Sequence, residues 1–305
     1  ITQDEKEYKY GEILKRQGYD VAGLRSQDYN ANFLPTENVR IPVNIDNVIN
    51  NNIVDEKYSD IIEEEIFIKI KSQALYKNRL IMLDIIANNN WKRPIYFTGG
   101  AFGDEDYLWM KDFLQLDGMC YKLVPIKTPI DKSNPFDMGM IDSEKMIRII
   151  DKWNWGIEDE KNIYLDVESR KNSITYRSNI SRLVEQLIFE NKLIEAEKII
   201  DKCMQKFPTN KFGYYTLLEP FINSYYEIKK EEKARKLFDE IAEKYQEKLF
   251  YYSGLDNSNK NKYAEEIYTD IERYRSLVDV MINFEDGEFL ETRMQEFNNY
   301  LDLFL

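Results

Sequence analysis

The chain has 305 residues, of which 43% are hydrophobic and 14% aromatic, so it is long enough to bury two ordinary cores and does not resemble a disordered protein. Its 42 basic and 55 acidic residues give a net charge of -13, and no long basic stripe is present, which argues against nucleic acid as a partner. Histidine is absent, which excludes Ser-His-Asp and Cys-His catalysis and removes the commonest ligand of transition metals. We therefore expect neither a metal nor a cofactor.

The two cysteines and the apolar runs narrow the class of protein further. Cys120 and Cys203 lie far apart in sequence, which indicates neither a disulfide framework nor a metal site, and each is expected to be a small buried residue. The longest apolar run, LIMLDIIA, is interrupted by Asp84 and is far shorter than the roughly 20 residues that cross a bilayer. The chain starts at Ile1 without a signal-like segment, so we expect it to be part of a longer protein.

The first part of the chain predicts short elements separated by turns. Residues 1–60 are polar and rich in Asn, which predicts a loop with one short strand near residues 39–43. The alternating segment EIFIKI predicts a strand over residues 65–70, and a helix is expected over about 74–87. The run Asn88 to Asn90 should end that helix, because Asn tolerates left-handed backbone conformations.

A second helix and two more strands are predicted after this break. Pro94 favours an extended strand over residues 95–98, and the acidic start of the next segment suits a helix over 107–116. Asp117 and Gly118 are expected to close this helix before the strand MCYKLVPI. Helix, strand, helix and strand in this order predict a small α/β domain over residues 1–127, followed by a bridging segment over 128–175 with a short helix near 143–153.

From about Ser178 the sequence becomes helical and contains an internal repeat. NKLIEAEKIIDKCMQKF aligns with KKEEKARKLFDEIAEKY, which places Ala196 on Ala234, 38 residues later (234 minus 196). A small alanine in the second helix, aromatics in the first and Pro208 near the end of the second helix resemble the tetratricopeptide repeat. We predict a TPR-like helical repeat domain (an α-α superhelix) over residues 176–305, with a degenerate third helix pair at 261–283 and 288–303.

Residues 91–103 offer two candidate sites, each with a structural alternative. GGAFG follows a strand and precedes a helix, as phosphate-binding loops do, but Asp104 to Asp106 would repel phosphate and a structural turn is favoured. Trp91, Lys92 and Arg93, with Tyr96 nearby, could bind a sugar or an anion. The alternative, which we favour, is that Trp91 packs in the core and Arg93 pairs with a nearby acid, because most aromatic residues are core or interface anchors.

The helical part offers a second group of candidates. GYYTLLEPFINSYY places Tyr215, Leu218, Ile222 and Tyr225 on one helical stripe, which is typical of a core. The residues that fall elsewhere around the helices could line the concave binding surface that repeat proteins present, namely Tyr214, Glu219, Asp270 and Arg273. Asp270 and Arg273 can also be interpreted as an i, i+3 ion pair.

Several long segments of the sequence resemble one known family. They are NFLPTENVRIPV, LDIIANNNWKRPIYFTGG, DYLWMKDFLQLDGMCYKLVPI, NPFDMG, RKNSITYRSNISRLVEQL, FGYYTLLEPF and AEEIYTDIERYR. Together they resemble, over nearly the whole chain, the C-terminal soluble region of a bacterial family of multi-spanning membrane proteins catalogued as a domain of unknown function. That family is similar to the GT-C glycosyltransferases and has a eukaryotic relative that acts as a protein O-mannosyltransferase.

The resemblance implies a parent enzyme that uses a polyprenyl-phosphate sugar, with its active site in the membrane part. No segment here matches the acidic exoplasmic loop that carries catalysis in GT-C enzymes, so no catalytic residue is assigned. The family's upstream GDND segment has no counterpart in this sequence, which leaves open whether the α/β sheet is complete. The implied location is the periplasmic face of the inner membrane, and the implied partners are an acceptor protein and the membrane domain of the same polypeptide.

Two other classes of function compete with this hypothesis. A TPR-like scaffold that captures an envelope protein, without any link to sugar transfer, would use the same helical surface. An independent hydrolase with paired carboxylates is the least favoured class, because no carboxylate pair at usable spacing can be identified in the sequence.

Overall fold

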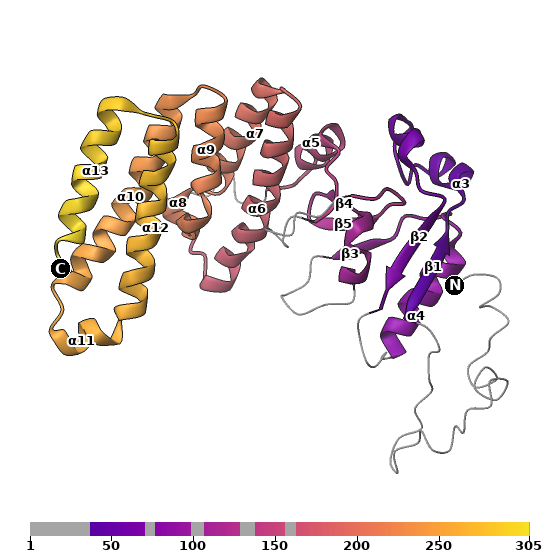
Figure 1. The fold of residues 1–305 in the computed structure, drawn as a ribbon, viewed down its shortest axis with the longest axis horizontal. Helices are drawn as coiled ribbons and strands as arrows, with labels where there is room; N and C mark the ends of the chain where they lie inside the picture. The colour runs from indigo at the N-terminus through magenta and orange to yellow at the C-terminus, as the bar shows by residue number, and fades with distance from the viewer. Residues whose placement is uncertain (1–36, 71–76, 99–106, 129–137, 156–162, 305) are drawn as a thin grey trace, which may run out of the picture. The chain divides into compact units, whose positions relative to one another are not determined.

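The computed structural model describes residues 37–70, 77–98, 107–128, 138–155 and 163–304 (Figure 1). The chain divides into two compact units, residues 1–150 and 151–305, which are called unit 1 and unit 2 below. The glycine turn at 99–103 and the acidic run after it lie outside the described residues.

Unit 1 begins with a two-stranded antiparallel sheet, in which β1 (Asn38–Pro42) pairs with β2 (Glu65–Lys69). The strands alternate buried and exposed residues, so one face carries the buried side chains Val39, Ile41, Ile66 and Ile68. Burying each such side chain contributes about 1.5–3 kcal/mol. Both strands were expected from the sequence, β1 from the prolines around it and β2 from its alternating pattern.

The segment between these strands is more ordered than its polar composition suggested. It contains the helix α3 (Ile45–Asn50) and the 3₁₀ helix η1 (Glu56–Ile61), where we expected a loop. The Asn44 side chain accepts a hydrogen bond from the backbone of Asn47, and the Asp55 side chain accepts one from the backbone of Lys57. Asn and Asp are therefore helix caps here, because their side chains satisfy backbone donors that a helix start leaves unpaired.

The second sheet of unit 1 has three antiparallel strands in the order β3-β5-β4. Its strands are β3 (Tyr96–Thr98), β4 (Leu114–Asp117) and β5 (Cys120–Leu123). The predicted helix over 107–116 is wrong: the chain forms the 3₁₀ helix η2 (Tyr107–Phe113) and then β4.

The error at this point has a local cause in the pair Asp117-Gly118. Asp117 pairs with Cys120 across a two-residue connection, and Gly118 has a φ of +66°. The two loop residues are therefore Gly118 and Met119, and a glycine with positive φ at the first position of such a loop is typical of a hairpin, whereas we interpreted Asp117-Gly118 as the end of a helix. Buried Leu114 and Leu116 then pack in the core from the strand.

The described residues of this part of the chain also form the helices α4 (Lys77–Asn89) and α5 (Ser143–Asp151). The asparagine run does end α4 as predicted, since Asn90 has a φ of +46° and Trp91 a φ of +57°. The asparagines of α3 hold this turn: Asn47 donates its side-chain amide to the Asn90 carbonyl over 2.8 Å, and Asn51 donates to the Trp91 carbonyl over 3.3 Å.

Unit 2 is helical, and most of its helices form hairpins (Figure 1). The helices are α6 (Val167–Phe189), α7 (Leu193–Lys206), α8 (Thr209–Phe212), α9 (Glu219–Glu227), α10 (Glu231–Ser253), α11 (Asn257–Lys262), α12 (Ala264–Asn283) and α13 (Gly287–Leu301). Helix α6 packs on α7, α9 on α10 and α12 on α13, while α10 also packs on α12. The first turns of α6 fall in the segment 128–175, which we expected to be a bridge.

The three hairpins share one turn geometry. Asn191, Lys229 and Glu285 lie one residue beyond the end cap of the first helix of each hairpin and have φ values of +57°, +61° and +53°. In each turn the next backbone N–H bonds a carbonyl five residues earlier: Lys192 to Leu187, Lys230 to Tyr225 and Asp286 to Met281. This is the Schellman arrangement, and Asn191 and Lys229 are 38 residues apart (229 minus 191), as in the sequence repeat.

The buried residues of unit 2 follow the aligned repeat. Ala196 and Ala234 are both fully buried, in α7 and α10. A side chain of one carbon allows a neighbouring helix to approach closely, which explains why a small residue recurs at this position. Assignment of these hairpins to the TPR class stays a prediction.

Both cysteines are free. Cys203 is buried as expected, and burial raises the pKa of its thiol to about 12, whereas Cys120 is only partly buried. Across the described ranges, no helix combines the length and the apolar character that a membrane span requires.

Candidate functional site

The predicted site at 91–96 contains one core residue and three exposed ones. Trp91 is 5% exposed, and its indole Nε1 donates a hydrogen bond to the Pro42 carbonyl over 3.0 Å. Lys92, Arg93 and Tyr96 are exposed. The indole therefore ties the end of α4 to β1, and only its three neighbours are open to a ligand.

A network of buried charges lies in the three-stranded sheet of unit 1, around Asp117. The Asp117 carboxylate accepts hydrogen bonds from the Tyr96 hydroxyl over 3.1 Å and from the Gln115 amide over 2.6 Å. It also forms an ion pair of 2.7 Å with Lys145, and Lys122 Nζ lies 3.8 Å away. We call this set of five residues the Asp117 network.

Lys122 is the unusual member of the Asp117 network, since its side chain is 2% exposed. Its amine donates a hydrogen bond to the Ile53 carbonyl. Burial lowers the pKa of Lys122 strongly, because desolvation disfavours the charged form; Asp117 opposes the shift and nearby Lys145 adds to it. Burial, helped by the Asp117 charge, also raises the pKa of Tyr96 to about 12.

The Asp117 network has the chemistry of an active site but not the access. A lysine with a lowered pKa beside a carboxylate and a phenol is a combination that enzymes use. Here Asp117 and Lys122 are almost completely buried, and they are held by Gln115, Lys145 and the Ile53 carbonyl. These two charges therefore join elements of unit 1, whereas Tyr96 and Lys145 are 47% and 27% exposed.

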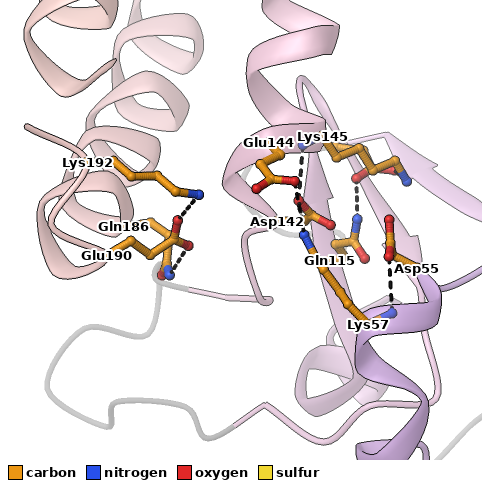
Figure 2. Close-up of polar contacts among 10 residues, drawn as sticks. Asp55, Lys57, Gln115, Asp142, Glu144, Lys145, Gln186, Glu190 and Lys192 are labelled. Carbon is orange, nitrogen blue, oxygen red and sulfur yellow. Dashed lines mark hydrogen bonds and ion pairs between the residues drawn. The ribbon is translucent and has the colours of Figure 1, made fainter. Parts of the chain in front are cut away.

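A second cluster in unit 1 joins η1 to α5, as Figure 2 shows. Lys57 donates to Asp142 over 3.1 Å and lies 3.7 Å from Glu144. Asp142 also accepts the backbone N–H of Lys145 over 3.0 Å, so it caps α5. The same figure shows Glu190 in unit 2 holding Gln186 and Lys192 at the α6-α7 turn, over 2.8 and 2.7 Å. Both clusters fix ends of helices.

Three of the predicted residues of unit 2 carry charges that act on one buried tyrosine. Burial is the main cause that raises the pKa of Tyr245, with smaller electrostatic effects from Arg273, Asp270 and Glu219. The ring of Tyr245 contacts that of Tyr215 edge to face at 5.0 Å. The sequence had placed these groups in separate segments, and helix packing collects them.

The individual contacts of these residues are structural. Asp270 is 2% exposed and pairs with Lys248 on α10 over 2.7 Å, rather than with Arg273, which is exposed. Glu219 accepts a hydrogen bond from Ser276 over 2.9 Å and so links α9 to α12. Tyr214 adopts a left-handed conformation with φ of +49° at the start of a 3₁₀ turn, η3 (Tyr215–Leu217).

Arg177 is a buried charge that sequence analysis missed. Its guanidinium is fully buried in α6 and donates to the carbonyls of Phe207 over 2.7 Å and of Gly213 over 2.6 Å, with a longer bond to Tyr214. Burial lowers the pKa of Arg177. No sequence signal marks it, because its partners are backbone atoms some 30 to 37 residues away.

Next to Arg177, an aromatic cluster lines an open pocket of about 650 Å³ that we call the Trp pocket. Ring contacts of 5.0 to 5.6 Å join its aromatic members, which are Trp153, Trp155, Tyr176, Phe207 and Phe212. Polar side chains of Asn172 and Gln205 and the cations Lys206 and Lys211 complete its lining. Sequence analysis also missed this site, although KWNWG and the KF pair before Pro208 carry its aromatics.

Another pocket of about 650 Å³ lies at the α12-α13 turn. Arg235 forms a bidentate pair with Asp286, which also accepts the Tyr226 hydroxyl, and the Arg235 hydrogen bonds lower the pKa of Asp286. Phe289 lies between Arg235 and Arg293 at 5.4 and 4.9 Å. The lining of this pocket contains three cationic and four acidic residues, so the pocket has no net preference for an anion.

Metal binding finds no support in the geometry. Within the part of the chain that the structure describes, no three His, Cys, Asp or Glu side chains are placed to hold a metal ion. The Asp117 carboxylate is occupied by cations and hydrogen-bond donors of the protein.

Comparison with known proteins links unit 1 to a family. Residues 1–145 match the family described as TMEM260-associated domain 2. The match spans 145 of the 305 residues and ends within α5, so unit 2 lies outside it. No curated protein and no solved structure matches the chain.

Proposed function

We propose that this chain is the non-catalytic, periplasmic C-terminal region of a GT-C-type membrane glycosyltransferase similar to the protein O-mannosyltransferases. In this proposal it binds the acceptor protein or supports the membrane domain of the same polypeptide. The observation that carries the proposal is the match of residues 1–145 to TMEM260-associated domain 2, which agrees with the resemblance of the sequence to a glycosyltransferase-like membrane family.

The burial of the two charges at the centre of the Asp117 network supports the non-catalytic part of the proposal. A general acid or base must come within hydrogen-bond reach of its substrate. Asp117 and Lys122 are 8% and 2% exposed, and they are held by Gln115 in the sheet, by Lys145 on α5 and by the Ile53 carbonyl. Chemistry would then belong to another part of the complete protein.

The hairpins of unit 2 support the binding part. Helical hairpins that repeat one turn geometry stack side by side and present extended surfaces to partners, as TPR-like superhelices do. The pocket at the α12-α13 turn and the Trp pocket both lie on described residues of unit 2, and the Trp pocket offers aromatic side chains, which are enriched where proteins bind ligands and partners.

Deletion of unit 2 tests the proposal. In the source organism, the complete gene that encodes this chain is replaced by a form without residues 151–305, and intact glycopeptides of the envelope are compared by mass spectrometry. We expect loss of glycan from a defined set of proteins, while the shortened protein still accumulates in the membrane. Lys198→Gln, a change at an exposed position of α7, is the matched control and should leave the profile unchanged.

Two results would contradict the proposal. An unchanged glycopeptide profile after deletion would remove the link to acceptor modification. A fusion of alkaline phosphatase to the C-terminus that is inactive in intact cells would remove the periplasmic location, because that enzyme is active only outside the cytoplasm.

A TPR-like scaffold of the cell envelope is the second candidate, favoured by one observation. The family match ends at residue 145, so the hairpins of unit 2 lie outside it and have no assigned link to sugar transfer. Recovery of a stoichiometric envelope protein with the purified chain, together with unchanged glycopeptides in the deletion strain, would support this function over the first.

A further inference from the structure

We propose that the Trp pocket binds a pyranose sugar that carries an acidic group. Its volume of about 650 Å³ lies in the range of small-molecule sites, and it is lined by aromatic rings with a few polar groups, as such sites are. The site lies wholly in unit 2, and the inference does not depend on the function proposed above, since the purified chain alone can be tested.

The aromatic rings provide flat apolar surfaces for a sugar ring. Trp153 meets both Trp155 and Tyr176 edge to face, at 5.3 and 5.0 Å between centroids. All three side chains are partly exposed, so the rings are not used up by packing. The face of an aromatic ring is electron-rich, and the polarised C–H bonds on one face of a pyranose lie well against it.

The polar lining matches the hydroxyl groups of a sugar. Asn172 and Gln205 are exposed, and within the described residues their amides form no hydrogen bond to the protein. Each amide has donor N–H groups and an acceptor oxygen. It can therefore bind two neighbouring sugar hydroxyls, because a hydroxyl group both donates and accepts hydrogen bonds.

The charge of the described part of the lining favours an anion. Among the described residues that line the Trp pocket, the charged ones are Lys211 and Lys206, which also has another contact within the chain, and none is a carboxylate. Lys211 forms no ion pair with any residue of the described ranges. A third cation, Lys202, lies 5.8 Å over the Trp155 ring but is paired with Asp151 over 2.8 Å.

A single ring fits the pocket better than a peptide strand does. Most lining residues belong to α6, α7 and α8 or their ends, where backbone donors and acceptors are already engaged within helices. A peptide that binds in extended form needs free backbone partners at a strand edge, and a helical peptide needs a continuous apolar groove. The Arg177 hydrogen bond to the Phe207 carbonyl fixes one wall of the pocket, which favours a pre-formed site.

The test uses a matched pair of probes with the purified 305-residue chain, namely methyl β-glucuronide and its neutral counterpart methyl β-glucoside. The chain has four tryptophans, so four indole N–H signals are expected in a nitrogen-15 spectrum, and Trp→Phe variants assign them. We expect the glucuronide to shift the signals of Trp153 and Trp155 and to leave those of Trp91 and Trp109 in place. The glucoside should bind about tenfold more weakly, because a charge-assisted hydrogen bond is lost.

Variants separate the charge from the shape of the pocket. Lys211→Gln should weaken glucuronide binding by about tenfold and leave glucoside binding unchanged, whereas Asn172→Ala should weaken both. Both changes are at positions that are at least partly exposed and should not disturb folding, and Lys198→Gln is the control. Trp155→Ala should abolish the shift of the Trp153 signal; its circular dichroism spectrum shows whether unit 2 remains folded.

Three results would overturn the inference. The first is the absence of any shift at Trp153 and Trp155 with either sugar. The second is equal affinity for both sugars together with no effect of Lys211→Gln. The third is an acidic hexapeptide that shifts the same signals as strongly as the glucuronide, which would show that the pocket selects acidic peptides and not sugars.

Discussion

The two units enclose their buried charges to different degrees. In unit 1 both side chains of the Asp117-Lys122 pair are buried inside a small sheet. In unit 2 the buried carboxylates Asp270 and Asp286 pair with Lys248 and Arg235, whose side chains are 45% and 38% exposed. Charges that are enclosed can stabilise or destabilise a fold but cannot meet a ligand, whereas an open helical surface can.

This difference also explains where the candidate sites lie. A sheet of three short strands has little apolar surface to spare, and the Asp117 network makes it dependent on one arrangement of charges. The hairpins of unit 2 bury apolar and aromatic residues along their length, so polar and aromatic groups at their ends remain free for binding.

Removing the central carboxylate should have the largest effect. Asp117→Asn leaves Lys122 buried without its counter-charge, which we expect to lower the free energy of unfolding of unit 1 by about 3 kcal/mol at pH 6. Urea unfolding measures this in a chain with Trp153→Phe and Trp155→Phe, where the remaining tryptophans report on unit 1. Asp112→Asn, at a partly exposed position before β4, is the control.

The same variant should show a defined pH dependence. The pKa of Lys122 is lowered from 10.5 to about 7 in the folded chain. Between pH 7 and pH 10.5 the unfolded chain therefore keeps the Lys122 proton while the folded chain has lost it. The free energy of unfolding rises with pH over this range. Without Asp117 the pKa of Lys122 in the folded chain falls further. The free-energy cost of burying the Lys122 amine is greatest at low pH, where the unfolded chain holds it protonated. The loss of stability should therefore shrink from pH 6 to pH 9, and a loss that grows over this range would contradict the role given to Lys122.

Arg177 is the exception that tests the comparison in unit 2. Arg177→Met leaves the carbonyls of Phe207 and Gly213 without their donor, which should cost about 3 kcal/mol in the free energy of unfolding. Circular dichroism during urea unfolding reports chiefly on the helices of unit 2, and Lys198→Met provides the control at an exposed position. If the variant is as stable as the control, unit 2 does not depend on its buried charge.

Elements with a clear hydrophobic period could be predicted from the sequence, and those decided by distant contacts could not. The alternation in EIFIKI correctly predicted the strand β2, and the asparagine run correctly predicted the end of α4. The helix over 107–116 failed because burial of Leu114 and Leu116 against β5 outweighs the local helical pattern. Local sequence carries no trace of that pairing apart from Asp117-Gly118.

The candidate sites show the same limit. Trp91 was both a candidate for ligand contact and, in the alternative that we favoured, a core residue; the structure buries it. The Trp pocket was missed because its walls come from residues 153–155, α6 and the α7-α8 turn, which packing brings together. Arg177 was missed because a buried arginine that binds only backbone carbonyls has no sequence pattern.

Filling the close helix contact of the repeat should have a smaller effect. Ala234→Leu adds three carbons at a fully buried position of α10, which we expect to destabilise unit 2 by about 1–3 kcal/mol. Ala264→Leu, at the exposed start of α12, is the matched control and should be nearly neutral. A similar loss of stability for Ala196→Leu would show that the two aligned alanines have the same role in helix packing. If Ala234→Leu left the stability unchanged, a neighbouring helix would not approach closely at this position.

Replacing the residue with positive φ in one hairpin turn by glycine should stabilise the protein slightly. Lys229 has a φ of +61°, a conformation that costs a residue with a Cβ about 1–2 kcal/mol and glycine almost nothing, so Lys229→Gly should raise the free energy of unfolding of unit 2 by about 1 kcal/mol. Asn191→Gly, at the equivalent turn, should gain less because Asn tolerates this region. Lys230→Gly, one residue later, should destabilise, since it loses a side chain without relieving strain. Equal effects of Lys229→Gly and Lys230→Gly would show that general flexibility, and not the shared turn geometry, determines the stability of the hairpin.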